Sequence, residues 1–430
     1  MLGGLLVPLL LGLPLRAAAQ ETAAPRAPVL DRPLRLFIDC RGPGCDTEFF
    51  RRELAWIDHV RDQKDADVHL LVTSQGTGGG GTEYLLRFIG HGQWEGQEDA
   101  LRRSVEAGDT EDQRRRALVQ IFSLGLARFA AATPVGPQLK ITPPANTATP
   151  VQSAVKEDPW NFWVFRTNLN MNMDGEALSS FKNFNANQSV NRTTDAWKIN
   201  FNAGMNYNES RYTLEEPEDG EDEFVSTRKG WNVNGLAVKS LTHRWSIGGR
   251  AGASRSTFLN QKLAARVAAG GEFNIFPYAQ SSERSWIIQW TAGISRFEYD
   301  EITIYEKTAE TKWSQSLVSE LDLRQPYGTI GLQMQFANYL DDPAVRRFSI
   351  EVDTDIRVSR GFSVRLFGEY ESIHDQLFLK RGEATNEEII ARQQQLQTSY
   401  RYFISAGITY RFGSINNNVV NTRFNSGGLF

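Results

Sequence analysis

The chain has 430 residues, long enough for two domains of ordinary size. Its formal net charge is -4, so it lacks the basic excess that neutralises phosphates, and we expect no nucleic-acid partner. The mean hydropathy of -0.41 is that of a polar chain. A membrane β-barrel stays compatible with this value, because its strands alternate lipid-facing and lumen-facing residues.

An apolar run over residues 1–15, interrupted by glycine and proline, opens the sequence and is followed by Ala17-Ala18-Ala19. The small residues match a cleavage site, so we predict a secretory signal peptide over residues 1–20. The alternative is a membrane-anchoring helix, but the run is short for ~30 Å of hydrocarbon. No later segment offers about eighteen uninterrupted apolar residues, so no transmembrane helix is expected.

The two cysteines, Cys40 and Cys45, are close in sequence. An exported chain meets an oxidising compartment, so we predict a disulfide between them. A metal site would need further ligands nearby, and the histidines form no metal-ligand spacing. We therefore expect neither a metal nor another cofactor.

Residues 30–132 show the mixture of predicted strands and helices that is typical of a small α/β domain. We predict strands over 34–39, 67–74 and 82–90, and helices over 46–56 and 111–131. The glycine run 75–81 fits a hairpin tip, because no Gly-Lys-Ser/Thr follows as a phosphate loop requires. Residues 133–159, rich in proline and threonine, are predicted to be a linker.

From Trp160 onward the sequence alternates apolar and polar residues over long runs, as in Trp197–Tyr207. Many runs exceed the ~5–6 residues of an average soluble strand. About twelve strands are expected to begin near Trp160, Ser179, Asp195, Glu223, Arg244, Gln261, Ser285, Ile302, Gly328, Arg347, Gly361 and Tyr400. We therefore predict an α+β chain overall, with a transmembrane antiparallel up-and-down β-barrel over residues 160–413.

The connections sort by length, as they do in outer-membrane barrels. Residues 242–243, 325–327 and 359–360 are expected to form short periplasmic turns, and 215–223 and 376–399 long outer loops. Tryptophans at the starts of outward strands fit an aromatic girdle at the inner interface.

The end of the last strand carries the most specific motif. Ser405, Gly407, Tyr410 and Phe412 resemble the C-terminal assembly signal of outer-membrane barrels, although a tail (414–430) follows. The segment 412–424 (FGSINNNVVNTRF) resembles the ending of a family of outer-membrane barrels of unknown function, which includes proteins described as salt-stress-induced.

The resemblance implies a place in the Gram-negative outer membrane, with the N-terminal domain and the C-terminal tail in the periplasm. The partners expected are outer-membrane lipid, the barrel-assembly machinery and a periplasmic protein bound by the N-terminal domain. The resemblance brings no assigned chemistry.

Charged residues in the alternating runs are predicted to face the barrel lumen, where they would line a polar pore or form a salt-bridged plug. They are Arg250, Arg266, Glu272, Glu351, Asp353, Asp355, Arg357, Arg365, Glu369 and Glu371. The first functional hypothesis is thus a passive, porin-like channel for small solutes or ions. The alternative is a non-conducting barrel that anchors a periplasmic domain binding an envelope partner.

An outer-membrane hydrolase is a distant third hypothesis. Asp341-Asp342 and His374-Asp375 lie at the outer ends of the ninth and the eleventh predicted strand, where a histidine beside a carboxylate could orient a water. Two strands apart, they would be neighbours on the wall and not opposed across a cleft. We therefore do not expect an enzyme.

Overall fold

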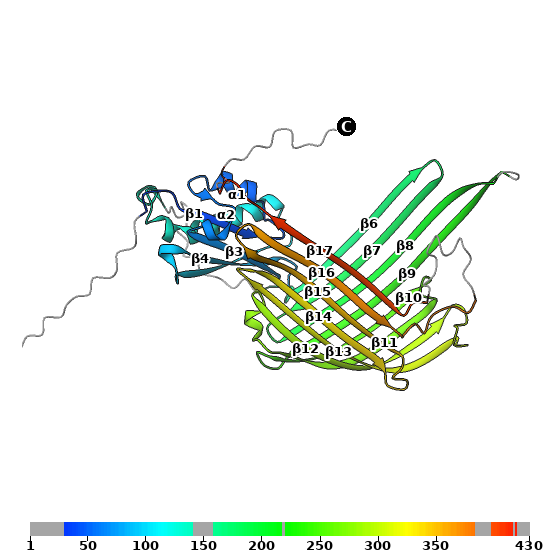
Figure 1. Cartoon of the computed structure of the whole chain (residues 1–430). Coiled ribbons are helices and arrows are strands. Elements are labelled where there is room, and N and C mark those ends of the chain that lie inside the picture. The colour runs from blue at the N-terminus through cyan, green and yellow to red at the C-terminus, as the bar shows by residue number, and fades with distance from the viewer. Residues whose placement is uncertain (1–29, 141–157, 217–219, 383–396, 416–417, 419–430) are drawn as a thin grey trace, which may run out of the picture.

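The computed structural model describes residues 30–140, 158–216, 220–382, 397–415 and 418 (Figure 1). The chain forms a small mixed α/β N-terminal domain and a large antiparallel sheet. The predicted signal peptide and most of the predicted linker and tail lie outside the described residues.

The N-terminal domain is built on a five-stranded sheet of order β2-β1-β3-β4-β5. β1 is parallel to β2 and β3, and β3, β4 and β5 are antiparallel neighbours. Its elements are β1 (Arg35–Cys40), α1 (Thr47–Glu53), β2 (Asp58–His59), β3 (Val68–Gly76), β4 (Thr82–Gly90), β5 (Glu98–Val105) and α2 (Glu111–Ala130). The three predicted strands and two predicted helices are confirmed. β2 and β5 were not predicted, because β2 is only two residues long and β5 is largely polar.

Helix α2 closes the core of this domain. A capping box between Thr110 and Gln113 satisfies free backbone N–H groups at its start. Leu118, Phe122 and Phe129 are fully buried with the apolar residues of the sheet. The helix comes so close to the sheet at Gly125 that an added Cβ would lie 2.1 Å from a ring carbon of Phe88. A glycine is therefore required here for packing.

The sulfur atoms of Cys40 and Cys45 lie at disulfide distance, as predicted, and their Cα atoms are 5.5 Å apart. The loop that they close lies between β1 and α1. Tyr84 on β4 donates a hydrogen bond of 2.7 Å from its hydroxyl to the carbonyl of Pro43 in this loop. The loop is thus closed by the disulfide and held to β4 by this hydrogen bond.

The large sheet has twelve antiparallel strands that follow one another in chain order, in the predicted number. They are β6 (Trp163–Glu176), β7 (Ser179–Thr193), β8 (Trp197–Glu216), β9 (Gly220–Ser240), β10 (Trp245–Ser256), β11 (Gln261–Asn274), β12 (Arg284–Tyr299), β13 (Ala309–Gln325), β14 (Gly328–Tyr339), β15 (Arg346–Ser359), β16 (Phe362–Ile373) and β17 (Tyr400–Tyr410). The shortest has 11 residues and the longest 21. No helix of the described part of the chain is long and apolar enough to cross a membrane.

Two sequence expectations about the connections were wrong. The eighth strand of the sheet begins at Ala309 and not near Ile302, because backbone hydrogen bonds from Thr303 to Lys307 and from Tyr299 to Thr308 close a turn there. Residues 215–223 are not a long loop: β8 continues to Glu216 and β9 begins at Gly220. The run of acidic residues had hidden the strand pattern.

The sheet curls but is not closed into a barrel, so the predicted closure is absent from this structure. β6 and β17 form its two edges and do not pair with each other (Figure 1). The twist and curl that accumulate over the twelve strands do not bring the two edges together. Every residue of β17 is exposed.

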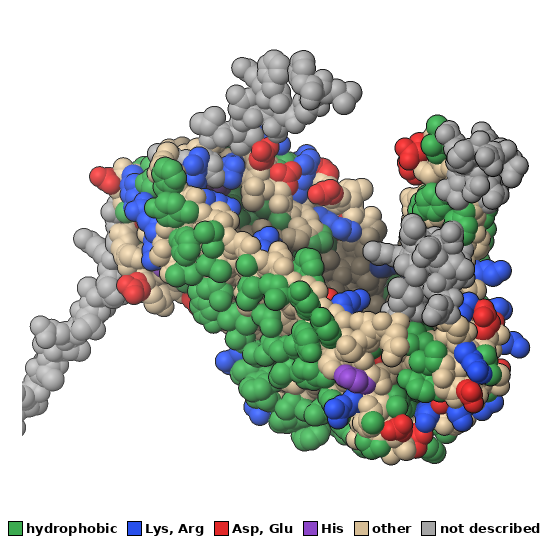
Figure 2. Space-filling view, turned by 45° about the vertical axis from the view of Figure 1, so that its right-hand side comes forward, with side chains coloured by type: hydrophobic (Ala, Val, Ile, Leu, Met, Phe, Trp, Pro, Cys, Tyr) green, Lys and Arg blue, Asp and Glu red, His purple; other side chains and the backbone are tan. Residues whose placement is uncertain are grey.

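The two faces of the sheet differ in chemistry. One face, here called the apolar face, carries exposed aromatic and aliphatic side chains such as Trp197, Trp245, Trp290 and Ile408. Figure 2 shows a broad hydrophobic area on the outside of the sheet. The opposite face is called the polar face. The residues on each face stay in line from strand to strand, because adjacent strands pair in continuous register over most of their length.

Candidate functional site

All ten charged residues that were predicted to face inward lie on the polar face of the sheet. On β15 and β16, Glu351 is opposite Glu369, and Asp355 is opposite Arg365. On β10 and β11, Arg250 and Arg266 share the same face as Glu272, which is opposite Ser246. The ten residues therefore share one face of the sheet, as the alternation of the sequence predicts.

The acidic residues gather on β13, β15 and β16. Sequence reasoning had missed two of them, Glu320 and Asp322, which the register places beside Gln333 and Gly331 on the polar face of β14. We call the acidic wall the set Glu320, Asp322, Glu351, Asp353, Asp355, Glu369 and Glu371. Asp355 pairs with Arg41 and Arg365, and Glu369 and Glu371 both pair with Arg401. Among the described residues, Glu351 and Asp353 form no ion pair, so the wall is neutralised only in part.

The polar face of β6 to β9 has a different character: asparagines occupy many of its alternate positions. We call this set the amide wall, with three asparagines from β6, four from β7, four from β8 and two from β9. They are Asn168, Asn170, Asn172, Asn183, Asn185, Asn187, Asn191, Asn200, Asn202, Asn206, Asn208, Asn232 and Asn234. The alternation of asparagines is visible in the sequence, although all residues predicted to face inward were charged ones.

Hydrogen bonds between side-chain amides link neighbouring strands of the amide wall. Asn187 and Asn202 donate to each other at 3.3 and 3.2 Å, and Asn200 donates to Asn191 at 2.6 Å. The Oδ1 atom of Asn200 is buried and has no hydrogen-bond partner among the described residues. Part of the hydrogen-bonding capacity of the wall is therefore free.

A cavity of about 610 Å³ lies on the polar face between the amide wall and β14. Asn200 and Asn202 line one side, and Arg250, Arg266 and Asn338 line others. Arg266 donates a 3.1 Å hydrogen bond to Ser314, whereas the side chain of Arg250 has no ion pair or hydrogen bond within the described part of the chain. The volume falls within the roughly 300–1,000 Å³ of small-molecule sites.

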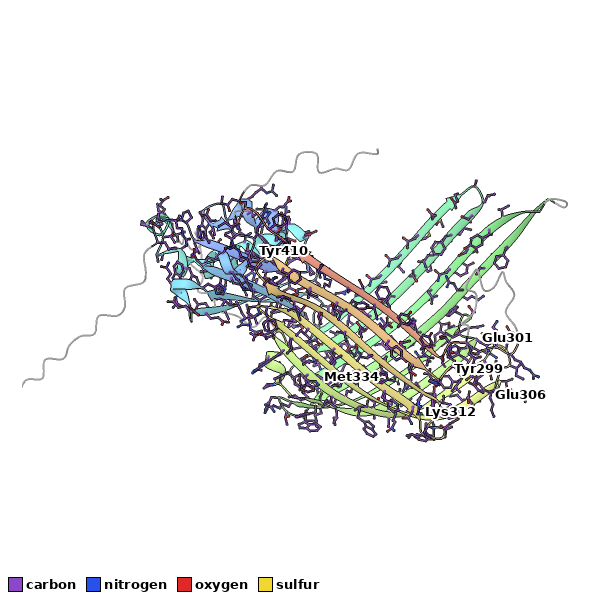
Figure 3. The ribbon with its side chains drawn as sticks, in the orientation of Figure 1. Tyr299, Glu301, Glu306, Lys312, Met334 and Tyr410 are labelled. Atoms are coloured by element: carbon purple, nitrogen blue, oxygen red, sulfur yellow. A yellow bond between two sulfur atoms is a disulfide. The ribbon has the colours of Figure 1, made fainter. Side chains whose placement is uncertain are left out.

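The loop after β16 crosses the far end of this cavity. Asn260, in the connection between β10 and β11, donates to the carbonyls of Glu301 and Phe378 at 2.9 and 3.2 Å. Lys380 forms a 2.7 Å ion pair with Glu301. Figure 3 shows Glu301 and Tyr299 at the end of the sheet remote from the N-terminal domain, whereas Tyr410 lies beside that domain. Residues 374–382 thus reach from β16 to loops several strands away.

The N-terminal domain is docked on the opposite end of the sheet, here called the docked end. Asp39, the penultimate residue of β1, pairs with Arg357 at 2.7 Å, and Arg41 pairs with Asp355 at 2.7 Å. Arg357 also lies over the ring of Phe37, with its guanidinium carbon 5.1 Å from the centroid. These pairs link residues more than three hundred positions apart, so no local pattern predicts them.

Asp39 is mostly buried in this interface. Its Oδ2 atom lies 3.8 Å from Nε2 of His69, which is fully buried and stacked on His91. Burial alone would raise the pKa of Asp39, but His69 and Arg357 outweigh it and hold that pKa well below its usual range. Asp39 is therefore an anion that Arg357 neutralises across the junction.

Contacts continue around the docked end. Arg360, in the turn between β15 and β16, pairs with Asp65 at 2.7 Å. At the other side, Arg166 of β6 donates a 3.4 Å hydrogen bond to the carbonyl of Gly80, in the hairpin tip between β3 and β4. Between these points, Ser281 donates to Gln75 at 3.3 Å. The domain therefore spans the docked end from β6 to β16.

The start of the C-terminal tail also binds the N-terminal domain. The N–H of Arg61 donates to the carbonyl of Ile415 at 3.2 Å. Asn418 accepts from the N–H of His59 at 2.6 Å and donates to Asp58 at 3.0 Å. Ile415 and Asn418 therefore contact residues in and beside β2, the edge strand of the small sheet.

The residues of the resembled assembly signal divide between the two faces. Ser405 is opposite Phe367 and Gly407 is opposite Arg365 on the polar face, whereas Tyr410 points to the apolar side. Phe412 lies just beyond β17 and is 82% exposed. These positions agree with the alternation predicted for the last strand.

The residues of the hydrolase hypothesis are engaged in separate contacts. Asp341 pairs with Lys312 at 2.7 Å, and Asp375 pairs with Arg347 at 2.9 Å. Among the described residues, the imidazole of His374 makes a weak contact of 3.4 Å with the hydroxyl of Ser372. Within the described ranges, no group of three or more His, Cys, Asp or Glu side chains could hold a metal ion.

The fold and site thus define a protein class by geometry: a twelve-stranded up-and-down sheet with one polar face, capped at one end by a mixed α/β domain. No protein-family model and no curated protein matches the chain.

Proposed function

We propose that this chain is an outer-membrane β-barrel that passes small polar solutes, with its N-terminal domain in the periplasm over the inner mouth. The observation that carries the proposal is the division of the sheet into an exposed apolar face and a polar face with a cavity of about 610 Å³. An apolar surface of this extent needs lipid or another apolar partner, because water would be a poor solvent for it. Lipid outside and water inside is the arrangement that satisfies both faces.

Closure of the sheet is part of the proposal. β6 and β17 are both edge strands, and they run antiparallel because an even number of strands separates the two ends of an up-and-down sheet. Unpaired N–H and C=O groups are costly in hydrocarbon. In a bilayer, pairing β6 with β17 would satisfy them and turn the polar face into a lumen.

The first test is single-channel conductance of the purified protein in a planar bilayer. A channel gives discrete current steps, and their size responds when Glu351 or Asp353 of the acidic wall is replaced by glutamine or asparagine. The matched control is Gln188→Ala, which changes the apolar side of β7 only. A correctly folded protein that gives no steps under any condition contradicts the proposal.

The second candidate is a non-conducting scaffold that holds the N-terminal domain. The contacts from β6 to β16 favour it, since the N-terminal domain lies across the docked end of the sheet. The two candidates separate in an Arg357→Gln variant, which removes one docking pair. Conductance that rises in this variant supports a covered channel, whereas a silent barrel in both proteins supports a scaffold.

A further inference from the structure

The amide wall and the cavity beside it narrow the solute to a chemical class. We infer that the polar face takes neutral polyhydroxylated solutes, such as sugars, in preference to anions. The inference rests on the proposed channel function and concerns what passes along the wall.

The first reason is the chemistry of the wall. Each asparagine side chain offers two donors and one acceptor oxygen without net charge. A hydroxyl group is also both a donor and an acceptor, so successive hydroxyls can bind successive amides. A wall of uncharged amides offers an anion dipoles but no opposite charge in place of the water it loses, and Arg250 and Arg266 are the cations that line the cavity beside it.

The second reason is that parts of the wall are free to bind. Asn168, Asn170 and Asn172 on β6 have no side-chain hydrogen bond among the described residues, and Asn200 keeps a buried free acceptor beside the cavity. A buried acceptor without a partner is costly, and a hydroxyl that donates to it recovers that cost. Selectivity in pores follows from such lining donors and acceptors.

The third reason lies on the opposite side of the face. Phe367 and Phe403 form a ring pair with centroids 5.8 Å apart on β16 and β17, where an apolar sugar face can rest. Beside them stand Glu351, Asp353 and Glu369 of the acidic wall, whose carboxylates accept hydrogen bonds from hydroxyls. The same carboxylates repel an anion of equal size.

The experiment compares three probes of similar size and hydroxyl content: glucose, gluconate and glucosamine. Their uptake is followed by swelling of liposomes that contain the full chain, and KCl conductance is recorded in parallel. We expect glucose to enter several times faster than gluconate. Glucosamine is a cation, so its rate of entry relative to glucose measures how much the acidic wall contributes to the selection among the three probes.

The variant that isolates the wall is Asn187→Ala with Asn202→Ala, which removes the reciprocal amide pair. Loss of two neutral hydrogen-bonding groups should lower glucose uptake about five-fold and leave KCl conductance within about two-fold. The control is again Gln188→Ala, in the same strand but on the other face. Heat-dependent migration on gels checks that each protein has folded.

The outcomes separate this inference from the channel itself. Conductance with equal entry of glucose and gluconate, or an asparagine variant that passes glucose as the native chain does, overturns the inference and leaves a channel. If the asparagine variant does not fold, the comparison of glucose with gluconate in the native chain decides. No conductance and no swelling with any probe, in the native chain and in Arg357→Gln, overturns both.

Discussion

The ion pair between Asp39 and Arg357 should dominate the docking of the N-terminal domain. The pair spans 2.7 Å, and the side chains of Arg357 and Asp39 are only 16% and 11% exposed. Removing one partner of such a pair leaves the other charge buried and uncompensated, at a cost of about 3–5 kcal/mol for full burial. Some solvent reaches both groups, so we expect about 3 kcal/mol for Arg357→Gln.

A change of about 3 kcal/mol lowers the ratio of docked to undocked protein about 150-fold. Hydrogen exchange can measure it, because the N–H of Gly361 donates to Asp62 at 2.5 Å across the same interface. In Arg357→Gln, exchange of peptides that contain this turn should accelerate by up to that factor. Exchange of α2, which lies inside the domain core, should be unchanged.

The control is Arg128→Gln, which removes an exposed pair with Asp99 inside the N-terminal domain. This pair does not involve the sheet, and exposed pairs contribute only about 0–1 kcal/mol. The reasoning fails if both variants leave exchange at the turn unchanged. It also fails if Asp39→Asn, when added to Arg357→Gln, accelerates exchange by as much again, since the two charges would then act independently.

Three further predictions concern the N-terminal domain. Gly125→Ala should lower its melting temperature and cost about 2 kcal/mol or more, despite the better helix propensity of alanine, because the new methyl group overlaps an aromatic ring. Burial, followed by repulsion from His69, lowers the pKa of His91. The contribution of His91 to the stability of the domain is therefore complete above the ordinary histidine pKa of about 6.5 and is lost as the pH falls below it. The variant His91→Gln should make the free energy of unfolding in urea depend less on pH. Reduction of the disulfide between Cys40 and Cys45 should cost about 2 kcal/mol, as a loop this short implies, and an unchanged urea midpoint would contradict it.

The strands of the large sheet could be predicted because apolar and polar residues alternate along each of them. Period-two alternation gave the number of strands in the large sheet and the face on which residues such as Glu351 lie. Where the pattern is interrupted by acidic residues, as near Glu216, or by a turn, as near Thr303, strand limits were wrong. β5 was not predicted, because an edge strand with polar residues on both faces has no alternation of apolar and polar residues.

The contacts between the two parts of the chain could not be predicted. From the local sequence, Asp39 is predicted near the end of a strand and Arg357 on the polar face of another. Nothing in the sequence indicates that the two side chains form an ion pair. The open sheet could not be predicted either. β6 and β17 alternate like the other strands, and only the structure shows that they do not pair with each other. Asparagine is uncommon in strands, so propensity alone argues against strands in the region of the amide wall, although the asparagines alternate there with other residues.

Docking and the charge of the polar face are coupled through shared residues. Asp355 and Arg357 lie on the polar face, yet both pair with the N-terminal domain, through Arg41 and Asp39. Undocking would remove Arg41 from Asp355 and leave only Arg365 to neutralise it, and it would free Arg357 from Asp39. The mouth would then present a different balance of charge to an entering solute. Any effect of the domain on passage should therefore be larger for charged probes than for glucose.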